Sequence, residues 1–247
     1  MEPTSTETGG GGKTWYDKFG TPIALVLGLG LIAAAIFYGG DGAPQNAGGN
    51  NGNGTPRGEG APVSIEDVKT ENSPSVGSLA APVVIAHWFD YQCPFCKRFD
   101  EVAMGKLYET YVKTGQVRII FKDFQFLSED SMTAARYGRA IYEAYPDKFF
   151  AYYQLMMENQ DEEHGGFGDE ASILAALKAS SLGIDTDRVK NMVASNQARY
   201  DAAIEADRDE GATLGVSGTP STLIGAALLP GAQPYETVEA ALKQVLK

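Results

Sequence analysis

The only two cysteines of the chain lie two residues apart, in the segment Cys93-Pro94-Phe95-Cys96. Such a pair can do either of two kinds of chemistry: it can form a short reversible disulfide, or it can supply two neighbouring thiolate ligands to a metal ion. A purely structural bridge is a weaker interpretation, because closing so short a loop stabilises a fold very little. The segments around the pair must decide between these chemistries.

The residues before and after the pair predict a strand-to-helix junction. Residues 83–89 are largely apolar and of strand length, which indicates a strand buried on both faces. Apolar residues then recur at helical spacing over 94–113, and 117–121 resembles a second buried strand. Cys93 would thus lie at the start of a helix, where unpaired N–H groups and the helix dipole favour a thiolate. Cys96 would lie one turn further in, shielded, and able to attack a mixed disulfide on Cys93.

The rest of the folded region, residues 63–247, is predicted to be mostly helical. Helices are expected over 132–145, 148–159, 170–181 and 186–214, the last either continuous or broken near Asn196. Asp147, Asp169 and Asp185 are candidate helix caps. Two short strands, 221–224 and 226–229, are expected to turn about Gly225, and 235–246 predicts a closing amphipathic helix.

The N-terminal part of the chain has a different character. Residues 19–38 carry no charge, and a helix of this length spans about 30 Å, the thickness of a bilayer core. Lys13 and Lys18 precede this segment and no basic residue follows before Arg57. The positive-inside rule then predicts a cytoplasmic tail over 1–18, a single transmembrane anchor over 19–38, and an extracytoplasmic remainder. A cleaved signal peptide is the alternative. Residues 39–62, rich in Gly and Asn, are expected to form a flexible linker.

The composition excludes some classes of protein. A net charge of −12 argues against nucleic-acid binding, which requires a basic surface. Two cysteines cannot make a disulfide-rich scaffold, so a packed core must stabilise the fold. The two histidines, His87 and His164, leave little material for a metal site.

Three pieces of the sequence together resemble the DsbA-like thiol-disulfide oxidoreductases of the thioredoxin superfamily. They are the motif at 90–96, the long helical stretch, and the segment 215–220 with the strand after it. The resemblance covers about residues 74–247. It implies an α/β thioredoxin fold with a central mixed sheet and an all-helical insertion at about 128–214. It also implies a cis bond between Thr219 and Pro220, and a redox-active cysteine pair that needs no cofactor.

The resemblance also suggests which residues form the site. Cys93, Cys96, Pro220 and His87 are the candidate catalytic residues. Candidates for substrate binding are Thr219, Phe95, Pro94 and Tyr91, with Tyr91 and Phe95 expected to be exposed beside the motif. Trp88, Phe89 and Phe99 either belong to the core or line a peptide groove near the cysteines.

Two of these positions depart from the family pattern. His87 stands where the family often has a buried glutamate, so it is either a proton shuttle for Cys96 or a core histidine bonded to backbone. Phe95 stands where the most oxidising members have histidine, and we therefore expect a less oxidising potential.

The function predicted from these features is that of a membrane-anchored, extracytoplasmic enzyme that exchanges its Cys93–Cys96 disulfide with cysteines of exported proteins. A membrane quinone-linked oxidase is the expected partner if the enzyme forms disulfides, and a membrane reductant if it reduces or isomerises them. The alternatives are a copper chaperone with thiolate ligands, and a chaperone that holds peptides without using its cysteines.

Overall fold

The computed structural model of the protein describes residues 63–161 and 167–246. The predicted tail, transmembrane anchor and linker, over 1–18, 19–38 and 39–62, lie outside the described residues, as does His164. In the part of the chain that is described, no helix has both the length and the apolar character needed to cross a membrane.

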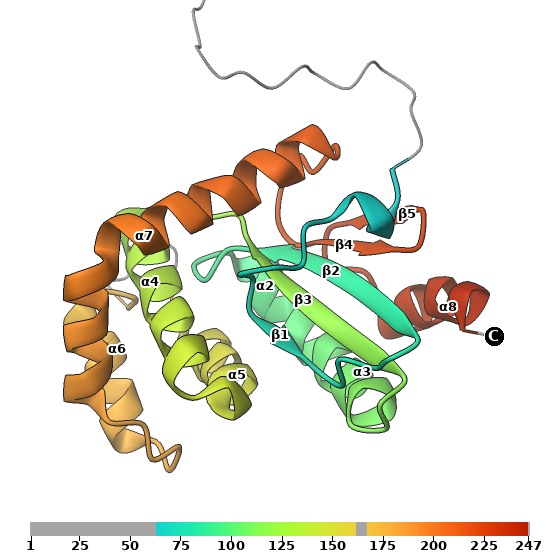
Figure 1. Cartoon of the computed structure of the whole chain (residues 1–247). Helices are drawn as coiled ribbons and strands as arrows, with labels where there is room; N and C mark the ends of the chain where they lie inside the picture. The colour runs from blue at the N-terminus through green and yellow to red at the C-terminus, as the bar shows by residue number, and fades with distance from the viewer. Residues whose placement is uncertain (1–62, 162–166, 247) are drawn as a thin grey trace, which may run out of the picture. The chain divides into compact units, whose positions relative to one another are not determined.

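Five strands form one mixed sheet in the order β1-β3-β2-β4-β5 (Figure 1). The strands are β1 (Ser75–Val76), β2 (Val83–Phe89), β3 (Val117–Asp123), β4 (Ser221–Ile224) and β5 (Ala227–Pro230). The two central strands, β2 and β3, run parallel, and the other three pairings are antiparallel. This is the central mixed sheet of a thioredoxin fold, as predicted. The expected strand 117–121 continues two residues further, through Lys122 and Asp123.

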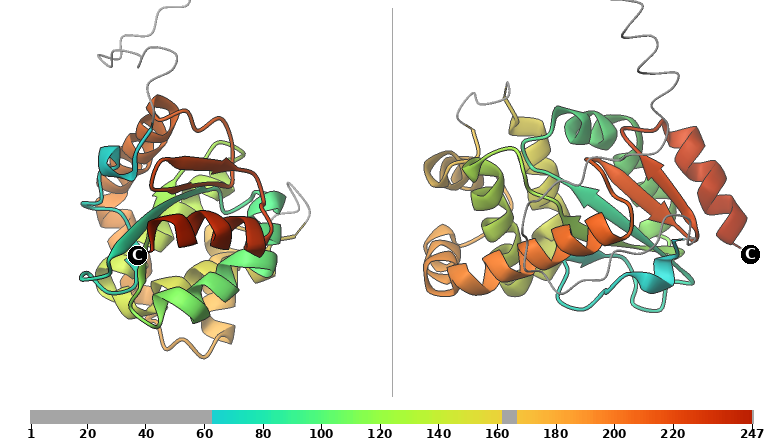
Figure 2. Two further views of the ribbon diagram at one scale, coloured as in Figure 1. Left: turned by 90° about the vertical axis from the view of Figure 1, so that its right-hand side faces the viewer. Right: turned by 90° about the horizontal axis from the view of Figure 1, so that it is seen from above.

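Both faces of β2 are buried, which explains its nearly continuous apolar sequence. Ile85 and Phe89 belong to the larger hydrophobic core, together with Val238 and Leu242 of the closing helix. Ala86 and Trp88 point to the opposite face and pack in a smaller core with Leu214. Seen from above, the helix that follows the cysteines and the long helix that precedes β4 lie on opposite sides of the sheet (Figure 2).

The helical segment after β2 begins as predicted but is not a regular α-helix throughout. It consists of α2 (Pro94–Phe99), a π-helical stretch η2 (Asp100–Met104), α3 (Gly105–Leu107) and a second π-helical stretch η3 (Tyr108–Val112). The backbone is helical at each junction, so the four pieces are continuous. The segment connects the parallel strands β2 and β3 and lies against the larger core through Phe99 and Leu107.

The helical block between β3 and β4 contains α4 (Glu129–Ala144), the short 3-10 turn η4 (Pro146–Lys148), α5 (Phe149–Asn159), α6 (Glu170–Ala179) and α7 (Thr186–Thr213). Asp169 and Asp185 cap α6 and α7 as predicted. Asp147 is not a cap, because Pro146 starts η4 and places Asp147 inside that turn. The helix α7 is continuous through Asn196, whose side chain bonds to the carbonyl of Met192 one turn earlier.

The closing helix α8 (Tyr235–Val245) follows β5, and its buried side chains Val238 and Leu242 join the larger core.

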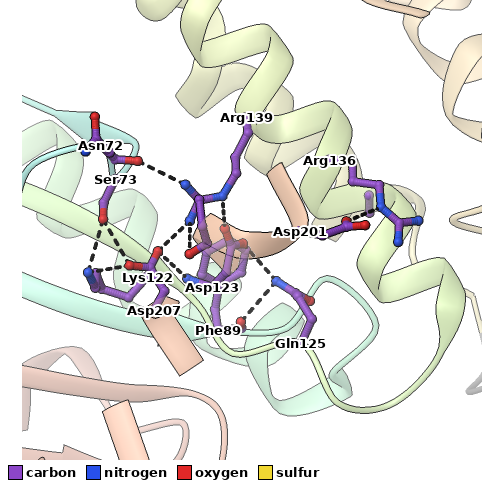
Figure 3. A network of polar contacts seen from close by, with 12 residues as sticks. Asn72, Ser73, Phe89, Lys122, Asp123, Gln125, Arg136, Arg139, Asp201 and Asp207 are labelled. Carbon is purple, nitrogen blue, oxygen red and sulfur yellow. Dashed lines mark hydrogen bonds and ion pairs between the residues drawn. The ribbon is translucent and has the colours of Figure 1, made fainter. Parts of the chain in front are cut away.

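A buried network of charges joins the helical block to the end of β3 (Figure 3). The guanidinium of Arg139, from α4, binds Asp123 at 2.7 Å and Asp207, from α7, at 2.6 Å. Lys122 pairs with Asp207 and, at 2.8 Å, with Glu210. Breaking such a buried pair leaves an uncompensated charge in a low dielectric, which is costly. The network therefore holds α4 and α7 in place against the sheet.

Candidate active site

The two cysteines lie where β2 gives way to α2, and both are buried. Cys93 is the residue before the first helical residue, Pro94, and keeps 5% of its surface exposed. Cys96 has no exposed surface. The carbonyl of Cys93 accepts hydrogen bonds from the backbone N–H groups of Cys96, at 2.9 Å, and Lys97, at 3.2 Å. Both cysteines are free thiols in this structure.

The environments of the two sulfurs push their pKa values in opposite directions. Hydrogen bonding from Cys96 lowers the pKa of Cys93 to about 6, against the opposing effect of burial, with further help from Thr219 and from the N–H groups of Cys96 and Phe95. Burial raises the pKa of Cys96 well above its usual range, and the neighbouring Cys93 raises it further. Near neutral pH Cys93 is therefore the thiolate and Cys96 the thiol, as the sequence predicts for an attacking and a resolving cysteine.

The segment before β4 faces the cysteines. The Thr219–Pro220 peptide bond is cis, as the resemblance implies. The thiol of Cys93 donates to the carbonyl oxygen of Thr219 at 3.4 Å. Ser221, the first residue of β4, fixes the turn by donating its hydroxyl to the carbonyl of Gly218 at 2.8 Å.

The carboxylate of Asp90 organises the loop that carries Cys93. One oxygen accepts from the backbone N–H of Gln92 at 2.8 Å and from the hydroxyl of Ser131 at 2.6 Å. The other accepts from the N–H groups of Phe126 and Leu127, at 2.9 and 3.2 Å. Asp90 thus ties the active-site loop to the loop after β3 and to the start of α4. An acidic residue just before a turn is a local signal that sequence reasoning could have used.

Two glutamines that sequence reasoning missed hold the same loop. The side-chain amide of Gln160, at the end of α5, donates to the carbonyls of Tyr91 and Cys93 at 2.8 and 3.2 Å. The amide oxygen of Gln125 accepts from the N–H of Tyr91 at 3.1 Å, and its amide nitrogen donates to Asp123 at 3.1 Å. Through Gln125, the loop is connected to the buried charge network. No pattern in the sequence marks either glutamine.

His87 is fully buried in β2, and its cross-strand neighbour in β4 is Thr222. Its Nδ1 lies 3.0 Å from the hydroxyl of Thr222, so its partner is a side chain and not backbone. The ring stacks on Phe99 with centroids 5.0 Å apart, and Nε2 has no hydrogen-bond partner among the described residues. Burial lowers the pKa of His87 to about 3, which keeps the ring neutral at physiological pH.

The comparisons with known proteins agree with this geometry. The sequence profile of the family described as "Thioredoxin" matches residues 69–244. The chain belongs to the thioredoxin family. It is 28% identical over 174 residues to the "Probable disulfide bond formation protein D" of Bacillus cereus, covering 70% of this chain and 78% of that protein. It is 22% identical over 183 residues to the "Disulfide bond formation protein D" of Bacillus subtilis.

Solved structures of thioredoxin-family proteins show the same fold. ScsC of Proteus mirabilis is 30% identical with a TM-score of 0.59, over 71% of this chain and 73% of that one. The thiol-disulfide exchange protein alpha-DsbA2 of Wolbachia pipientis is 24% identical with a TM-score of 0.64, over 73% and 90% of the two chains. With its reactive cysteine pair, this thioredoxin-family chain is a DsbA-like protein-disulfide oxidoreductase, and the pair itself carries the electrons without a bound cofactor.

Of the two aromatic residues expected to be exposed beside the cysteines of this thioredoxin-family site, only Phe95 is exposed. Phe95 is 58% exposed between the cysteines, as predicted. Tyr91 is not exposed: it is 1% accessible and lies in the core. Its ring enters the helical block beside Gly138 of α4, where an added Cβ would lie only 2.5 Å from the tyrosine hydroxyl. The expectation that Tyr91 is exposed is therefore wrong, and its side chain offers no surface to a substrate in this structure. Trp88, Phe89 and Phe99 are buried, so they belong to the core and do not line an exposed groove.

The copper-chaperone alternative finds no support in the arrangement of donor groups. Within residues 63–161 and 167–246, no three side chains of His, Cys, Asp or Glu come together in a way that could hold a metal ion. Copper sites with two thiolates usually add a histidine or methionine ligand. The nearest candidate in the sequence, His87, is buried against Phe99 and bonded to Thr222.

Proposed function

We propose that this oxidoreductase forms disulfides in exported proteins, and that it works on the outer side of a membrane to which residues 19–38 anchor it. The observation that carries the proposal is the asymmetry of the cysteine pair. The sulfur next to the cis Thr219–Pro220 bond ionises readily, whereas its partner is fully buried. A disulfide between such sulfurs is a good oxidant, because reduction releases a stable thiolate on Cys93.

The reaction proceeds through a mixed disulfide. A substrate thiolate attacks Sγ of Cys93 in the oxidised enzyme, and the Cys93–Cys96 bond breaks as the new S–S bond forms. A second substrate thiolate then attacks the substrate sulfur of the mixed disulfide. Cys93 leaves as a thiolate, and the substrate is released with a disulfide. The low pKa of Cys93 makes it the better leaving group in this second step.

The residues around Cys93 suit an extended peptide as substrate. The carbonyl of Thr219 can accept a hydrogen bond from a substrate N–H group, as in strand addition, while Pro220 keeps this backbone turned toward the cysteines. The exposed ring of Phe95, with Pro94 beside it, offers an apolar contact to the substrate side chains that flank the reacting cysteine.

Reoxidation requires a partner in the membrane, and a quinone-linked oxidase would complete the cycle. Two observations support the disulfide-forming direction and the location. The Bacillus relatives are named as disulfide bond formation proteins, and residues 19–38 have the length and apolar character of a membrane anchor.

A trapping experiment in cells tests the proposal. In the Cys96→Ser variant of the full chain, mixed disulfides on Cys93 cannot be resolved from within the enzyme, so exported cysteine-containing proteins should accumulate on it. The Cys93→Ser variant is the matched control and should trap none. Alkylation of the wild-type protein in cells should find the Cys93–Cys96 pair mostly oxidised. A mostly reduced pair would assign the enzyme to disulfide reduction or isomerisation.

A further inference from the structure

Lys97 joins the helix that carries the cysteines to the end of α5. The two helices α2 and α5 pack against each other. The ammonium of Lys97 donates to the backbone carbonyl of Gln160 at 2.8 Å and to that of Glu158 at 3.4 Å. The last carbonyls of a helix lack partners within it and lie at the negative end of the helix dipole, so they favour a cation. Lys97 therefore caps α5 with a donor that comes from α2.

Gln160 in turn contacts the loop of the reactive cysteine. Its side-chain amide donates to the carbonyl of Cys93 at 3.2 Å and to that of Tyr91 at 2.8 Å. The same Cys93 carbonyl also accepts the backbone N–H of Lys97 at 3.2 Å. Lys97, Gln160 and Cys93 are thus joined pairwise by three hydrogen bonds, which form a closed circuit between α2, α5 and the active-site loop.

Little else in the described part of the chain fixes the backbone of Gln160. It follows Asn159, the last residue of α5, and its own backbone is not helical, with φ −57° and ψ 123°. Its N–H group reaches the carbonyl of Met157 only at 3.4 Å. Gln160 is nevertheless buried, with 7% of its surface exposed. The bond from the Lys97 ammonium is therefore the shortest hydrogen bond that holds this backbone among the described residues.

The position of the Cys93 backbone matters for the chemistry of its sulfur. The hydrogen bond from the Cys96 side chain is the largest cause of the lowered pKa of Cys93, and the backbone N–H groups of Cys96 and Phe95 add to it. Hydrogen bonds weaken steeply when donor and acceptor are misaligned. A loop that moved relative to α2 would therefore raise the pKa of Cys93 and turn its sulfur away from the direction of attack.

We propose that Lys97 is a positioning residue for thiol-disulfide exchange. By holding Gln160 at the end of α5, it fixes the backbone of Cys93 in the geometry in which the sulfur is ionised and open to attack. This role concerns the exchange chemistry of the pair and does not depend on the direction of electron flow proposed above.

The test compares the ionisation of Cys93 in matched variants of the full chain. Each reduced protein is alkylated with iodoacetamide at a series of pH values on both sides of about 6, the pKa of Cys93. Mass spectrometry follows the modification of Cys93. The rate follows the thiolate fraction, so the midpoint of the pH profile gives the pKa of Cys93 in each protein.

Removing the donor should weaken the thiolate. Lys97→Met should raise the midpoint by about half a unit or more, the effect of losing a hydrogen bond of ordinary strength. Lys97→Arg keeps donors that can reach the end of α5 and should restore the wild-type midpoint. Gln160→Ala removes the other half of the circuit and should also raise it. A folded Lys97→Met or Gln160→Ala protein with the wild-type midpoint would overturn the proposal.

Two comparisons separate positioning from the effect of a nearby charge. Arg98→Met removes the neighbouring cation, which is exposed and has no hydrogen-bond or ion-pair partner among the described residues, and it should leave the midpoint unchanged. The double variant Lys97→Met, Gln160→Ala should have the midpoint of Gln160→Ala alone, because Lys97 acts through Gln160.

A direct effect of the Lys97 charge would give different results. The two single shifts would then add in the double variant, and the shift in Lys97→Met would fade at high salt. Either outcome would rule out the positioning role. If Gln160→Ala does not fold, the Lys97 variants, Arg98→Met and the salt dependence carry the test without it.

Discussion

The thiol of Cys93 donates a hydrogen bond to the backbone carbonyl of Thr219, 3.4 Å away, next to the cis bond to Pro220. Neither the thiolate nor the disulfide form of Cys93 has a proton to donate, so in both forms this carbonyl is free to accept from an incoming peptide N–H group. The carbonyl that contacts the reactive sulfur is therefore also the acceptor available to a substrate backbone.

The pKa of Cys93 should depend on the hydrogen bond that the side chain of Cys96 donates to its sulfur. Replacing Cys96 with alanine removes that hydrogen bond, which is the largest effect lowering the pKa of Cys93 to about 6. We expect the pKa to rise in Cys96→Ala and to stay close to the original value in Cys96→Ser, whose hydroxyl can still donate. Titration of thiolate absorbance at 240 nm checks this. Equal pKa values in the two variants would contradict the assignment.

Phe95 should set the oxidising strength of the pair. The ring is 58% exposed and brings no positive charge to the Cys93 thiolate. In Phe95→His, an imidazolium would stabilise the thiolate, lower the pKa of Cys93 and raise the reduction potential, by about 30 mV for each 1.4 kcal/mol gained. Equilibration with glutathione measures the potential. Leu79→His, also at an exposed apolar position but outside the motif, should leave it unchanged.

Burial of His87 should make the fold sensitive to acid. Its pKa is lowered from 6.5 to about 3, so the unfolded chain binds a proton at pH values where the folded protein does not. This contribution of the neutral ring to the free energy of unfolding is complete above pH 6.5 and is lost progressively as the pH falls toward 3. The loss amounts to about 2 to 3 kcal/mol by pH 4.5. Urea unfolding at several pH values should therefore show a shallower acid dependence in His87→Gln. Identical slopes in the two proteins would rule this out.

Gln160 should stabilise the active-site loop. In Gln160→Ala the buried carbonyls of Tyr91 and Cys93 each lose a donor, and we expect a loss of about 1 to 3 kcal/mol in the free energy of unfolding. The adjacent variant Asn159→Ala removes one exposed hydrogen bond within α5 and should cost much less. Denaturant unfolding compares the two. A similar loss of stability in both variants would show that the buried hydrogen bonds of Gln160 contribute no more than one exposed hydrogen bond.

The buried charge network should matter far more than surface ion pairs. Arg139→Met leaves Asp123 buried without a cation and leaves Asp207 with Lys122 as its only cation among the described residues, and we expect a loss of about 3 to 5 kcal/mol. Arg199→Met breaks an exposed pair with Glu143 and should change stability by about 0 to 1 kcal/mol. Thermal and urea unfolding of both variants provide the measurement. Comparable losses would mean that the network does not anchor the helical block.

The amino-acid sequence by itself determined the features that depend on neighbouring residues. The apolar run of β2, the cysteine spacing and the proline after Cys93 together predict a reactive cysteine at a helix start, because helix ends and strand periodicity are local properties. The Gly218-Thr219-Pro220 segment indicated a cis proline only through its resemblance to a family. The sequence did not predict that β3 continues through Lys122 and Asp123, because the partners that neutralise these two charges lie on α7 and α4.

Only the tertiary structure decided the surroundings of the cysteines. Tyr91 is buried because α4 presents Gly138 to it, and no local pattern reports a partner 47 positions away. Likewise, Gln160 reaches the loop of Cys93 from the end of α5. Burial, and with it the raised pKa of Cys96 and the lowered pKa of His87, follows from how distant segments pack. The sequence therefore identifies the reactive pair, while packing sets its proton chemistry.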